Sequence, residues 1–450
     1  MVANILDLLL KQIFGQPFIL MAIIVFVGYI AMKQKVSKAL VGAAKASIGI
    51  LVMGMGSGAL IANFGKLLTA LQTATGITGA GLNTYPTMTA SYEKMDAILG
   101  AGTGATWGIY TLLVGFILNL ILVALNKYTK IRAVYLTGNA MIVQAGISTY
   151  VVWRFLGLGM IPTVLIASLI TALYWGIFST LLIKPTHMIT GADFTVAHQQ
   201  MFMNYVAYKI APKIGNAEKD DIEKKKMPDS LNFLQDNIIA TALIMFISVA
   251  VIMLVVGPEQ IDWLRSAAGL NQAGLTNNVV FLVWTAVTLT ANIVVLLSGV
   301  RMFVGEMMMS FKGISEKILP GAVAGVDCAA IFAFAPKSVV LGLLCGALGQ
   351  ILGLILLAVF KSPIFLVPGF IPLFFDNATI AIFANKFGGW KAAAIIVTIN
   401  GMIQIFGSAL AVSMMELTWW QGSADYATIW VAIIAVFKFV GGLLGIPVAG

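Results

Sequence analysis

Long apolar runs limit the folds open to this chain more than any other feature of its sequence. About eleven stretches hold almost no charged side chain, and a helix needs about 20 apolar residues to cross a bilayer. Charged residues make up 10% of the 450-residue chain, against about 25% in a soluble domain. We therefore expect an all-α polytopic membrane protein, without the alternation of a membrane barrel. The expected transmembrane helices are residues 17–33, 39–62, 106–126, 133–153, 158–183, 236–257, 278–300, 318–335, 338–360, 391–414 and 427–446.

Lysines and arginines gather between these runs. They concentrate in residues 33–38, in residues 127–132 and in the one long polar stretch, 209–230. Basic flanks mark the cytoplasmic side of a membrane protein, so the net charge of +9 does not indicate nucleic-acid binding. The pattern predicts a lipid bilayer as the surroundings, an external N-terminus and a cytoplasmic C-terminus. Residues 258–277 and 416–426 are poor in lysine and read as external, with their Trp and Tyr at the interface.

Three segments are too polar or too broken to span the membrane simply, namely residues 64–105, 187–208 and 364–390. Irregular backbone at membrane depth is tolerated only inside protein or beside a cavity, so we expect broken or re-entrant segments there. A fourth segment, 301–317, carries several charges and is expected to be an amphipathic helix at the interface.

Two pairs of similar segments indicate an internal repeat. Residues 136–146 (LTGNAMIVQAG) align with 319–329 (LPGAVAGVDCA), an offset of 183, and 190–200 (TGADFTVAHQQ) with 368–378 (PGFIPLFFDNA), an offset of 178. Repeated halves with broken helices in matching places are typical of transporters, whose substrate site lies between the repeats. The expected crossings give both halves the same sense, whereas an inverted repeat requires opposite senses.

Asp327 is the only charged residue between Lys317 and Lys337. A carboxylate at the centre of a membrane helix costs about 2.5–3.5 kcal/mol or more, so such residues usually face a cavity and serve a function. The alternative is a structural contact with the backbone. The aligned residue of the first half, Gln144, is also polar, and together the two residues predict a pocket for a hydroxylated ligand.

Three hydrogen-bonding side chains, His198, Gln199 and Gln200, follow one another in an apolar stretch. They offer donors and acceptors, which favours a broken helix that presents them to a cavity. Solvated amides at the membrane interface are the alternative. Thr84 and Tyr85 precede Pro86, where a helix is expected to be interrupted; they could bind a sugar or belong to an ordinary turn.

A metal site is not expected. His187 and His198 lie eleven residues apart, and no cysteine or acidic cluster accompanies them along the sequence. The two cysteines, Cys328 and Cys345, have a spacing that suits no metal site and are expected to be small core residues. We also find no nucleophile–base pattern and no cofactor motif.

Several long blocks resemble the ascorbate-specific membrane component, the IIC permease, of the bacterial phosphotransferase system (PTS). The blocks are KIRAVYLTGNAM, GADFTVAHQQMFMNYVAYKIAP, LNFLQDNIIATA, GVRMFVGEMMMSFKGISEKILPGAVAGVDCAAIFAFAP and PGFIPLFFDNATIAIFANKFGGW. The resemblance implies a homodimer in the bacterial inner membrane, with eleven membrane helices and an inverted repeat per chain. It also implies an elevator-like movement of a core domain that binds ascorbate, against a dimerising V-motif domain. The sugar is then phosphorylated by the cytoplasmic IIB component, which IIA recharges, so no catalytic residue and no cofactor are expected in this chain.

On this resemblance the chain divides at its polar and broken segments. The expected parts are V-motif helices 1–63, a core domain 64–208, a cytoplasmic linker 209–235, V-motif helices 236–300, a core domain 301–425 and a C-terminal helix 426–450.

The resemblance also implies substrate contacts. They are Thr84, Tyr85, Asn139, Val143, Gln144, His198, Gln199 and Asp327. The family motif reads Thr-Gly-His with a Gln four residues after the His, whereas this chain has Asn139, then Val143, with Gln144 one step later. Asn can donate and accept hydrogen bonds but Val cannot, so the expected substrate is L-ascorbate or a related sugar acid or polyol. The alternatives are a secondary transporter in which Asp327 and His198 relay protons, and a membrane receptor without transport.

Overall fold

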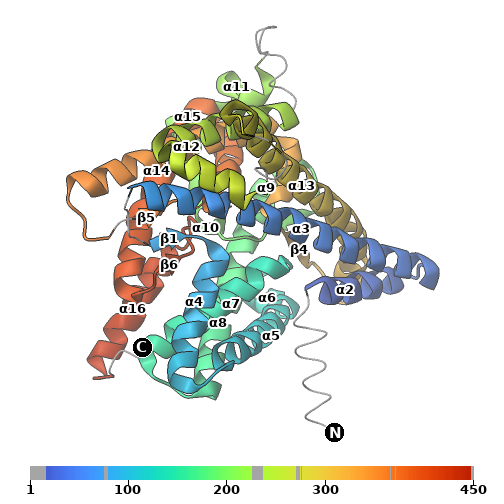
Figure 1. Cartoon of the computed structure of the whole chain (residues 1–450). Coiled ribbons are helices and arrows are strands. Elements are labelled where there is room, and N and C mark those ends of the chain that lie inside the picture. The colour runs from blue at the N-terminus through green and yellow to red at the C-terminus, as the bar shows by residue number, and fades with distance from the viewer. Residues whose placement is uncertain are drawn as a thin grey trace.

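The computed structural model describes residues 17–75, 80–225, 237–269, 274, 276–364, 366–369 and 371–446, and it is mostly helical (Figure 1). The helices are α2 (Pro17–Ala31), α3 (Val36–Thr75), α4 (Thr84–Leu99), α5 (Thr103–Ala124), α6 (Asn126–Thr129), α7 (Gly138–Leu156), α8 (Met160–Leu181), α9 (Ile183–Thr190), α10 (Met201–Ile214), α11 (Ala217–Asp220), α12 (Asn237–Ala267), α13 (Asn278–Lys317), α14 (Pro336–Val359), α15 (Asn377–Met415) and α16 (Ile429–Leu443), with 3₁₀ helices η2 (Ile222–Lys224) and η4 (Cys328–Phe334) and a π-helix η5 (Pro372–Asp376). The strands are β1 (Ala80–Leu82), β2 (Ala133–Tyr135), β3 (Phe194–Val196), β4 (Val323–Val326), β5 (Leu366–Val367) and β6 (Trp419–Trp420).

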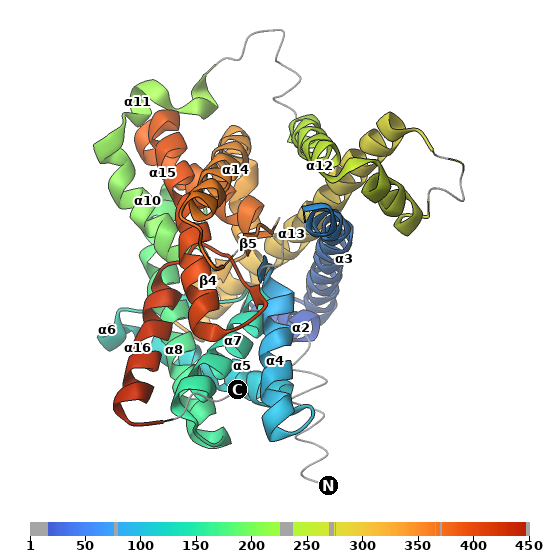
Figure 2. The ribbon, with the colours of Figure 1, turned by 60° about the vertical axis from the view of Figure 1, so that its left-hand side comes forward.

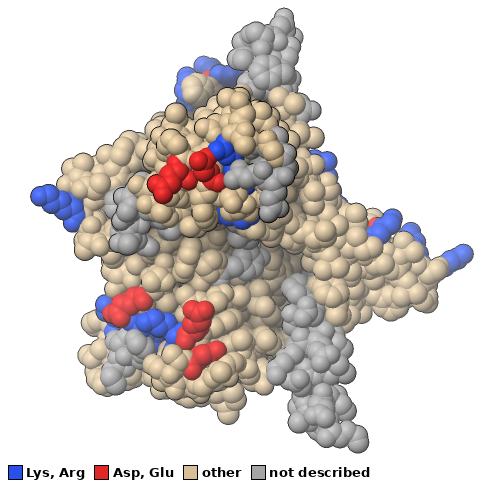
Figure 3. All heavy atoms as spheres, viewed as in Figure 1, with Lys and Arg blue, Asp and Glu red and all other residues tan. Residues whose placement is uncertain are grey.

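The surface of these helices suits a bilayer. Among the described residues, 7 helical stretches are long and apolar enough to cross a membrane, and two shorter apolar helices, Ala22–Ala31 and Ile429–Leu443, accompany them. Large apolar side chains point outward, as do Leu254 at 85% and Phe439 at 70% exposure. Figure 3 shows charged side chains only as small separate groups on a largely uncharged surface. Exposed apolar area of this extent fits contact with lipid, and the chain is a polytopic membrane protein.

Two 40-residue helices, α3 and α13, pack against each other and carry α2 and α12 beside them (Figure 2). A helix of 40 residues is about 60 Å long, twice the thickness of the hydrocarbon core. Because α13 continues to Lys317, the separate interfacial helix expected at 301–317 is wrong. Both long helices also run past residues 63 and 300, where domain boundaries were predicted.

Two small parallel sheets interrupt the helices, so the expected all-α fold is wrong in this respect. In one sheet β1 pairs with both β5 and β6, and in the other β4 pairs with both β2 and β3. Every residue of β1, β2, β3 and β4 is buried. Strands buried on both faces need not alternate apolar and polar residues, and a short apolar run cannot be told from a buried helix by periodicity.

The strands reveal which parts of the two halves correspond. The first half supplies the middle strand of one sheet and both outer strands of the other, and the second half does the reverse. The middle strand β4 begins 243 residues after β1 (323 against 80), and each follows a 40-residue helix. The predicted offsets of 183 and 178 residues are therefore wrong. Asn83, and not Gln144, occupies the position of Asp327, because each directly follows a middle strand.

The interruptions predicted in residues 64–105, 187–208 and 364–390 are confirmed, since each range contains a strand between helical segments. The interruption expected at Tyr85 and Pro86 lies slightly earlier in the chain: β1 ends at Leu82 and α4 begins at Thr84, so both residues belong to the first turn of α4. The expected span 318–335 is wrong: it consists of β4 and the 3₁₀ helix η4. The expected span 133–153 begins with β2, and only its later part is the helix α7.

The first part of the predicted linker 209–235 is folded onto the helices, while residues 226–236 lie outside the described part of the chain. Glu223 accepts the backbone N–H of Ser338 at 2.7 Å, which satisfies a free donor in the first turn of α14. Asn385 of α15 donates to Asp221 Oδ1 at 2.8 Å. This segment therefore covers the start of α14 and the part of α15 around its break at Gly389.

A small cluster of charged side chains, Asp220, Lys225 and Lys391, lies beside this segment. Asp220 pairs with Lys225 at 3.2 Å and with Lys391 at 3.3 Å. The hydrogen bond from Lys225, and then that from Lys391, lowers the pKa of the Asp220 carboxyl below its usual value. The carboxyl therefore stays ionised at neutral pH.

Candidate functional site

The carboxyl ends of the strands define the candidate site. Because all pairings in both sheets are parallel, the three strands of each sheet end at a common edge, which is where parallel sheets usually hold their ligands. In the sheet of β2, β4 and β3, Asp327 directly follows β4, and His198 lies two residues after β3. In the other sheet, Asn83 and Gln421 directly follow β1 and β6.

The polar trio, His198, Gln199 and Gln200, forms hydrogen bonds with residues of the second half of the chain. Ser423 Oγ donates to Gln199 Oε1 at 3.0 Å, and Gln200 Nε2 donates to Thr379 Oγ1 at 3.0 Å. His198, Gln199 and Gln200 are 7%, 2% and 0% exposed. The trio is therefore buried between the two halves, and its interpretation as solvated amides at the interface is wrong.

Asp327 makes a structural hydrogen bond with the backbone and also lies beside the side chains of His198 and Cys328. Its Oδ1 accepts the backbone N–H of Ala329 at 2.9 Å and so caps η4. Ligand atoms of Asp327, Cys328 and His198 also lie within 4.8 Å of one another, and all three side chains are buried. The structure thus brings a cysteine and an acid to His198, although neither lies near it in the sequence.

Two of the predicted contacts, Thr84 and Asn139, lie at the beginnings of α4 and α7. These helices pack side by side. Tyr92 of α4 and Gly146 of α7 each lie eight residues after the first residue of their helix, and a Cβ at Gly146 would lie 2.5 Å from the Tyr92 hydroxyl. Neither helix has a side-chain cap, so free N–H donors remain in both first turns.

Several buried polar atoms around the site have no hydrogen-bond partner among the described residues. They are Asn83 Oδ1, Thr84 Oγ1, Asn139 Oδ1, Asp376 Oδ1 and both amide atoms of Gln421. An unpaired buried polar atom costs about 1–3 kcal/mol, and native proteins satisfy nearly all of them with protein, water or ligand. The arrangement can therefore bind a ligand that offers several hydroxyl groups.

The remaining predicted contacts behave differently. Gln144 Nε2 donates to the Tyr135 hydroxyl at 3.1 Å, and that hydroxyl donates to the His198 carbonyl at 3.0 Å. Gln144 thus supports the backbone of His198 from behind. Val143 is fully buried. The side chain of Tyr85 lies outside the described part of the structure.

Nothing in the sequence singles out Asp425. Its carboxylate accepts hydrogen bonds from the Tyr174 hydroxyl at 2.6 Å and from the backbone N–H groups of Phe202 and Met203 at 2.9 and 3.1 Å. It therefore holds the start of α10, directly after the polar trio. Asp425 belongs to segment 416–426, whose aromatic residues were expected at the membrane interface. Trp420 and Tyr426 are both fully buried, so that expectation is wrong for these two side chains.

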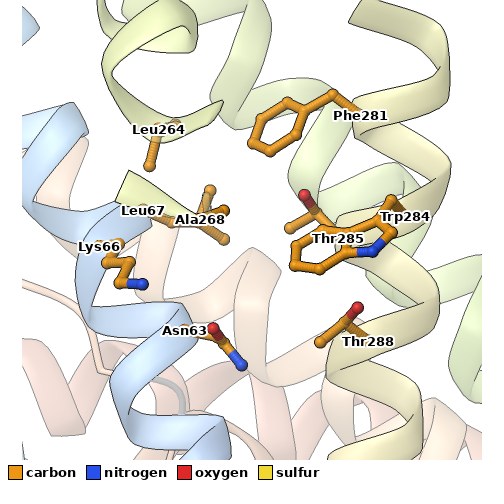
Figure 4. A pocket seen from close by; sticks show the side chains of 9 residues that line it. All are labelled: Asn63, Lys66, Leu67, Leu264, Ala268, Phe281, Trp284, Thr285 and Thr288. Atoms are coloured by element: carbon orange, nitrogen blue, oxygen red, sulfur yellow. The ribbon is translucent and has the colours of Figure 1, made fainter. Parts of the chain in front are cut away.

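A separate pocket lies between α3, α12 and α13 (Figure 4). Asn63 and Lys66 line it from α3, with Trp284 and Thr285 opposite them on α13. Lys66 Nζ donates to the carbonyl of Ala267 at 3.0 Å. The pocket contains none of the residues described above, so it is distinct from the site between the sheets.

Comparison with known proteins agrees with a transport role. Residues 12–435 match the family EIIC-GAT, described as "PTS system sugar-specific permease component". The chain is also 30% identical over 431 residues to the "Ascorbate-specific PTS system EIIC component" of Mycoplasma pneumoniae (strain ATCC 29342 / M129 / Subtype 1). The match covers 88% of this chain and 65% of that relative, so the chain spans somewhat less than two thirds of the relative's length.

Proposed function

This chain belongs to the EIIC-GAT family of PTS sugar-specific permease components, and from that premise we propose that it binds L-ascorbate and carries it across the bacterial inner membrane. The proposed partners are the cytoplasmic IIB and IIA components, which phosphorylate the arriving sugar. The named relative supports ascorbate as the sugar, because its description is ascorbate-specific.

The observation that carries this proposal is the mixed chemistry at the two strand edges. Asp327, His198 and Gln199 are buried at the edge of the sheet whose strand β2 leads into the uncapped first turn of α7, and the uncapped first turn of α4 follows the middle strand of the other sheet. A helix N-terminus favours negative charge, so these two ends can hold the enolate of ascorbate. The Asp327 carboxylate then accepts a hydrogen bond from a sugar hydroxyl, which is strong because the acceptor is ionised.

Asn139 and Val143 affect how well the site can distinguish ascorbate from related sugar acids. Asn139 Oδ1 is buried without a partner, so it can accept a hydrogen bond from a ligand hydroxyl. Val143 contributes only an apolar side chain. A related sugar acid therefore remains the second candidate substrate.

We further propose that the helices move as two groups within a homodimer. The layer of α2, α3, α12 and α13 forms the fixed V-motif, and the elements around the two sheets form a core that moves with the sugar. The separation of these groups in Figure 2 supports this division.

Uptake by proteoliposomes tests the proposal. We expect the purified chain, supplied with phosphorylated IIB and IIA on the cytoplasmic side, to accumulate ascorbate as its phosphate ester. Collapse of the proton gradient should leave this uptake unchanged. Uptake that follows a proton gradient without IIB would instead identify a secondary transporter using His198 and Asp327, and binding without any flux would identify a receptor.

A further inference from the structure

Three buried side chains with different metal-binding atoms meet in the site. The Asp327 carboxylate, the Cys328 sulfur and a ring nitrogen of His198 lie within 4.8 Å of one another. We propose that they form a binding site for a transition metal ion, with Zn²⁺ as the best match, that overlaps the sugar site. The overlap, though not the metal site itself, rests on the proposed function.

The hydrogen bonds of His198 prepare it to bind a metal. Its Nδ1 lies 2.8 Å from Gln200 Oε1, which also accepts the backbone N–H of Gln199 at 2.9 Å. The amide nitrogen, Gln200 Nε2, donates to Thr379 Oγ1. In this orientation of the amide, its oxygen accepts hydrogen bonds and its nitrogen donates one. Nδ1 must then carry the proton, and Nε2 keeps a free lone pair. Metal-binding histidines are usually oriented in this way by a second hydrogen bond.

The other two ligands are also held in place. The backbone N–H of Ala329 fixes Asp327 through Oδ1, and a carboxylate has further lone pairs for a metal. Cys328 is fully buried at the start of η4. Three protein ligands leave the fourth position of a tetrahedral zinc site open to water.

The charges of the three ligands and their soft sulfur and nitrogen atoms favour Zn²⁺ over Mg²⁺ and Ca²⁺. A thiolate and a carboxylate together balance the two charges of Zn²⁺, and the imidazole stays neutral. When the zinc–sulfur bond forms, the Cys328 thiol releases its proton to solvent, so binding should strengthen as the pH rises. Mg²⁺ and Ca²⁺ prefer oxygen ligands, whereas thiolate and imidazole suit zinc and its neighbours. Ligand atoms of a tetrahedral zinc site lie about 3.4–3.6 Å from one another, so these atoms must approach by up to about 1.4 Å.

Metal titration of the purified full-length chain tests the site without sugar. We expect Zn²⁺ to bind in calorimetry, Mg²⁺ not to bind, and Co²⁺ to produce a thiolate-to-metal charge-transfer band. Cys328→Ser should remove this band and weaken zinc binding by at least about tenfold. Cys345→Ser, which removes the half-buried cysteine of α14, is the matched control and should keep both signals. Thermal unfolding of each variant shows that it is folded.

The proposal is overturned if the wild type binds no Zn²⁺, or if a folded Cys328→Ser variant binds it as the wild type does. A second titration tests the overlap: Zn²⁺ should weaken ascorbate binding to the wild type and to Cys345→Ser. Zinc binding that leaves ascorbate affinity unchanged would overturn the overlap and move the proposed sugar position, while the metal site would stand. Ascorbate that fails to bind in the absence of zinc would count against the proposed function alone.

Discussion

Asp327→Asn should weaken ascorbate binding by about one to two orders of magnitude, because a hydrogen bond to a charged group contributes about 1.5–3 kcal/mol. The substitution removes the negative charge and keeps the shape of the side chain. Asn Oδ1 can still accept the backbone N–H of Ala329, as Asp327 does now, so η4 should stay capped. The effect should therefore appear in equilibrium binding and not in thermal unfolding.

Asp96→Asn is the matched control for that prediction. Asp96 also accepts backbone N–H groups, from Gly102 at 2.9 Å and Gly104 at 2.7 Å. It lies near the end of α4, at the opposite end from Thr84, and should leave ascorbate affinity at the wild-type value. Equal affinity of wild type and Asp327→Asn would remove Asp327 from the sugar site.

Asp425→Ala should destabilise the protein by about 3–5 kcal/mol, since it leaves several buried hydrogen-bond donors without an acceptor, at about 1–3 kcal/mol each. The Tyr174 hydroxyl and the N–H groups of Phe202 and Met203 would all lose their acceptor. Because these groups directly follow the polar trio, ascorbate binding should weaken as well. Denaturant unfolding in detergent measures the first effect.

Tyr174→Phe separates the parts of this network. It removes a single donor and leaves Asp425 bound to both backbone groups, so it should cost clearly less stability than Asp425→Ala. If Asp425→Ala unfolds at the same denaturant concentration as the wild type, Asp425 does not hold the start of α10 in the way described.

The sequence was sufficient to predict the chemically unusual part of the site. Asp327 is a lone acid in an apolar stretch, and His198 and Gln199 are polar residues in another. Burial of polar groups in apolar surroundings is costly, so such residues stand out without a structure. The structure confirms that they are buried together.

Cys328 and Asp425 could not be predicted in the same way. A cysteine in an apolar stretch is indistinguishable from a core residue until its neighbours are known. Asp425 lies in a polar segment that resembles a loop, and its partner Tyr174 lies 251 residues away in the sequence. Both assignments depend on tertiary contacts between the two halves.

The repeat was misaligned for a related reason. Segment 319–329 contains β4, whereas segment 136–146 begins directly after β2, and these two strands pair as neighbours from Ala133 with Val323 to Tyr135 with Gly325. Each strand is only three or four residues long, so spacing of glycine and polar residues was the only signal. The true correspondence follows from strand order, which a single sequence does not display.

The most direct test of the account is equilibrium binding of L-ascorbate to the purified chain, beside a panel of other sugar acids and pentitols. We expect saturable binding that is tightest for ascorbate and that weakens in Asp327→Asn. A folded wild-type protein that fails to bind ascorbate, or that binds a pentitol more tightly, would contradict it.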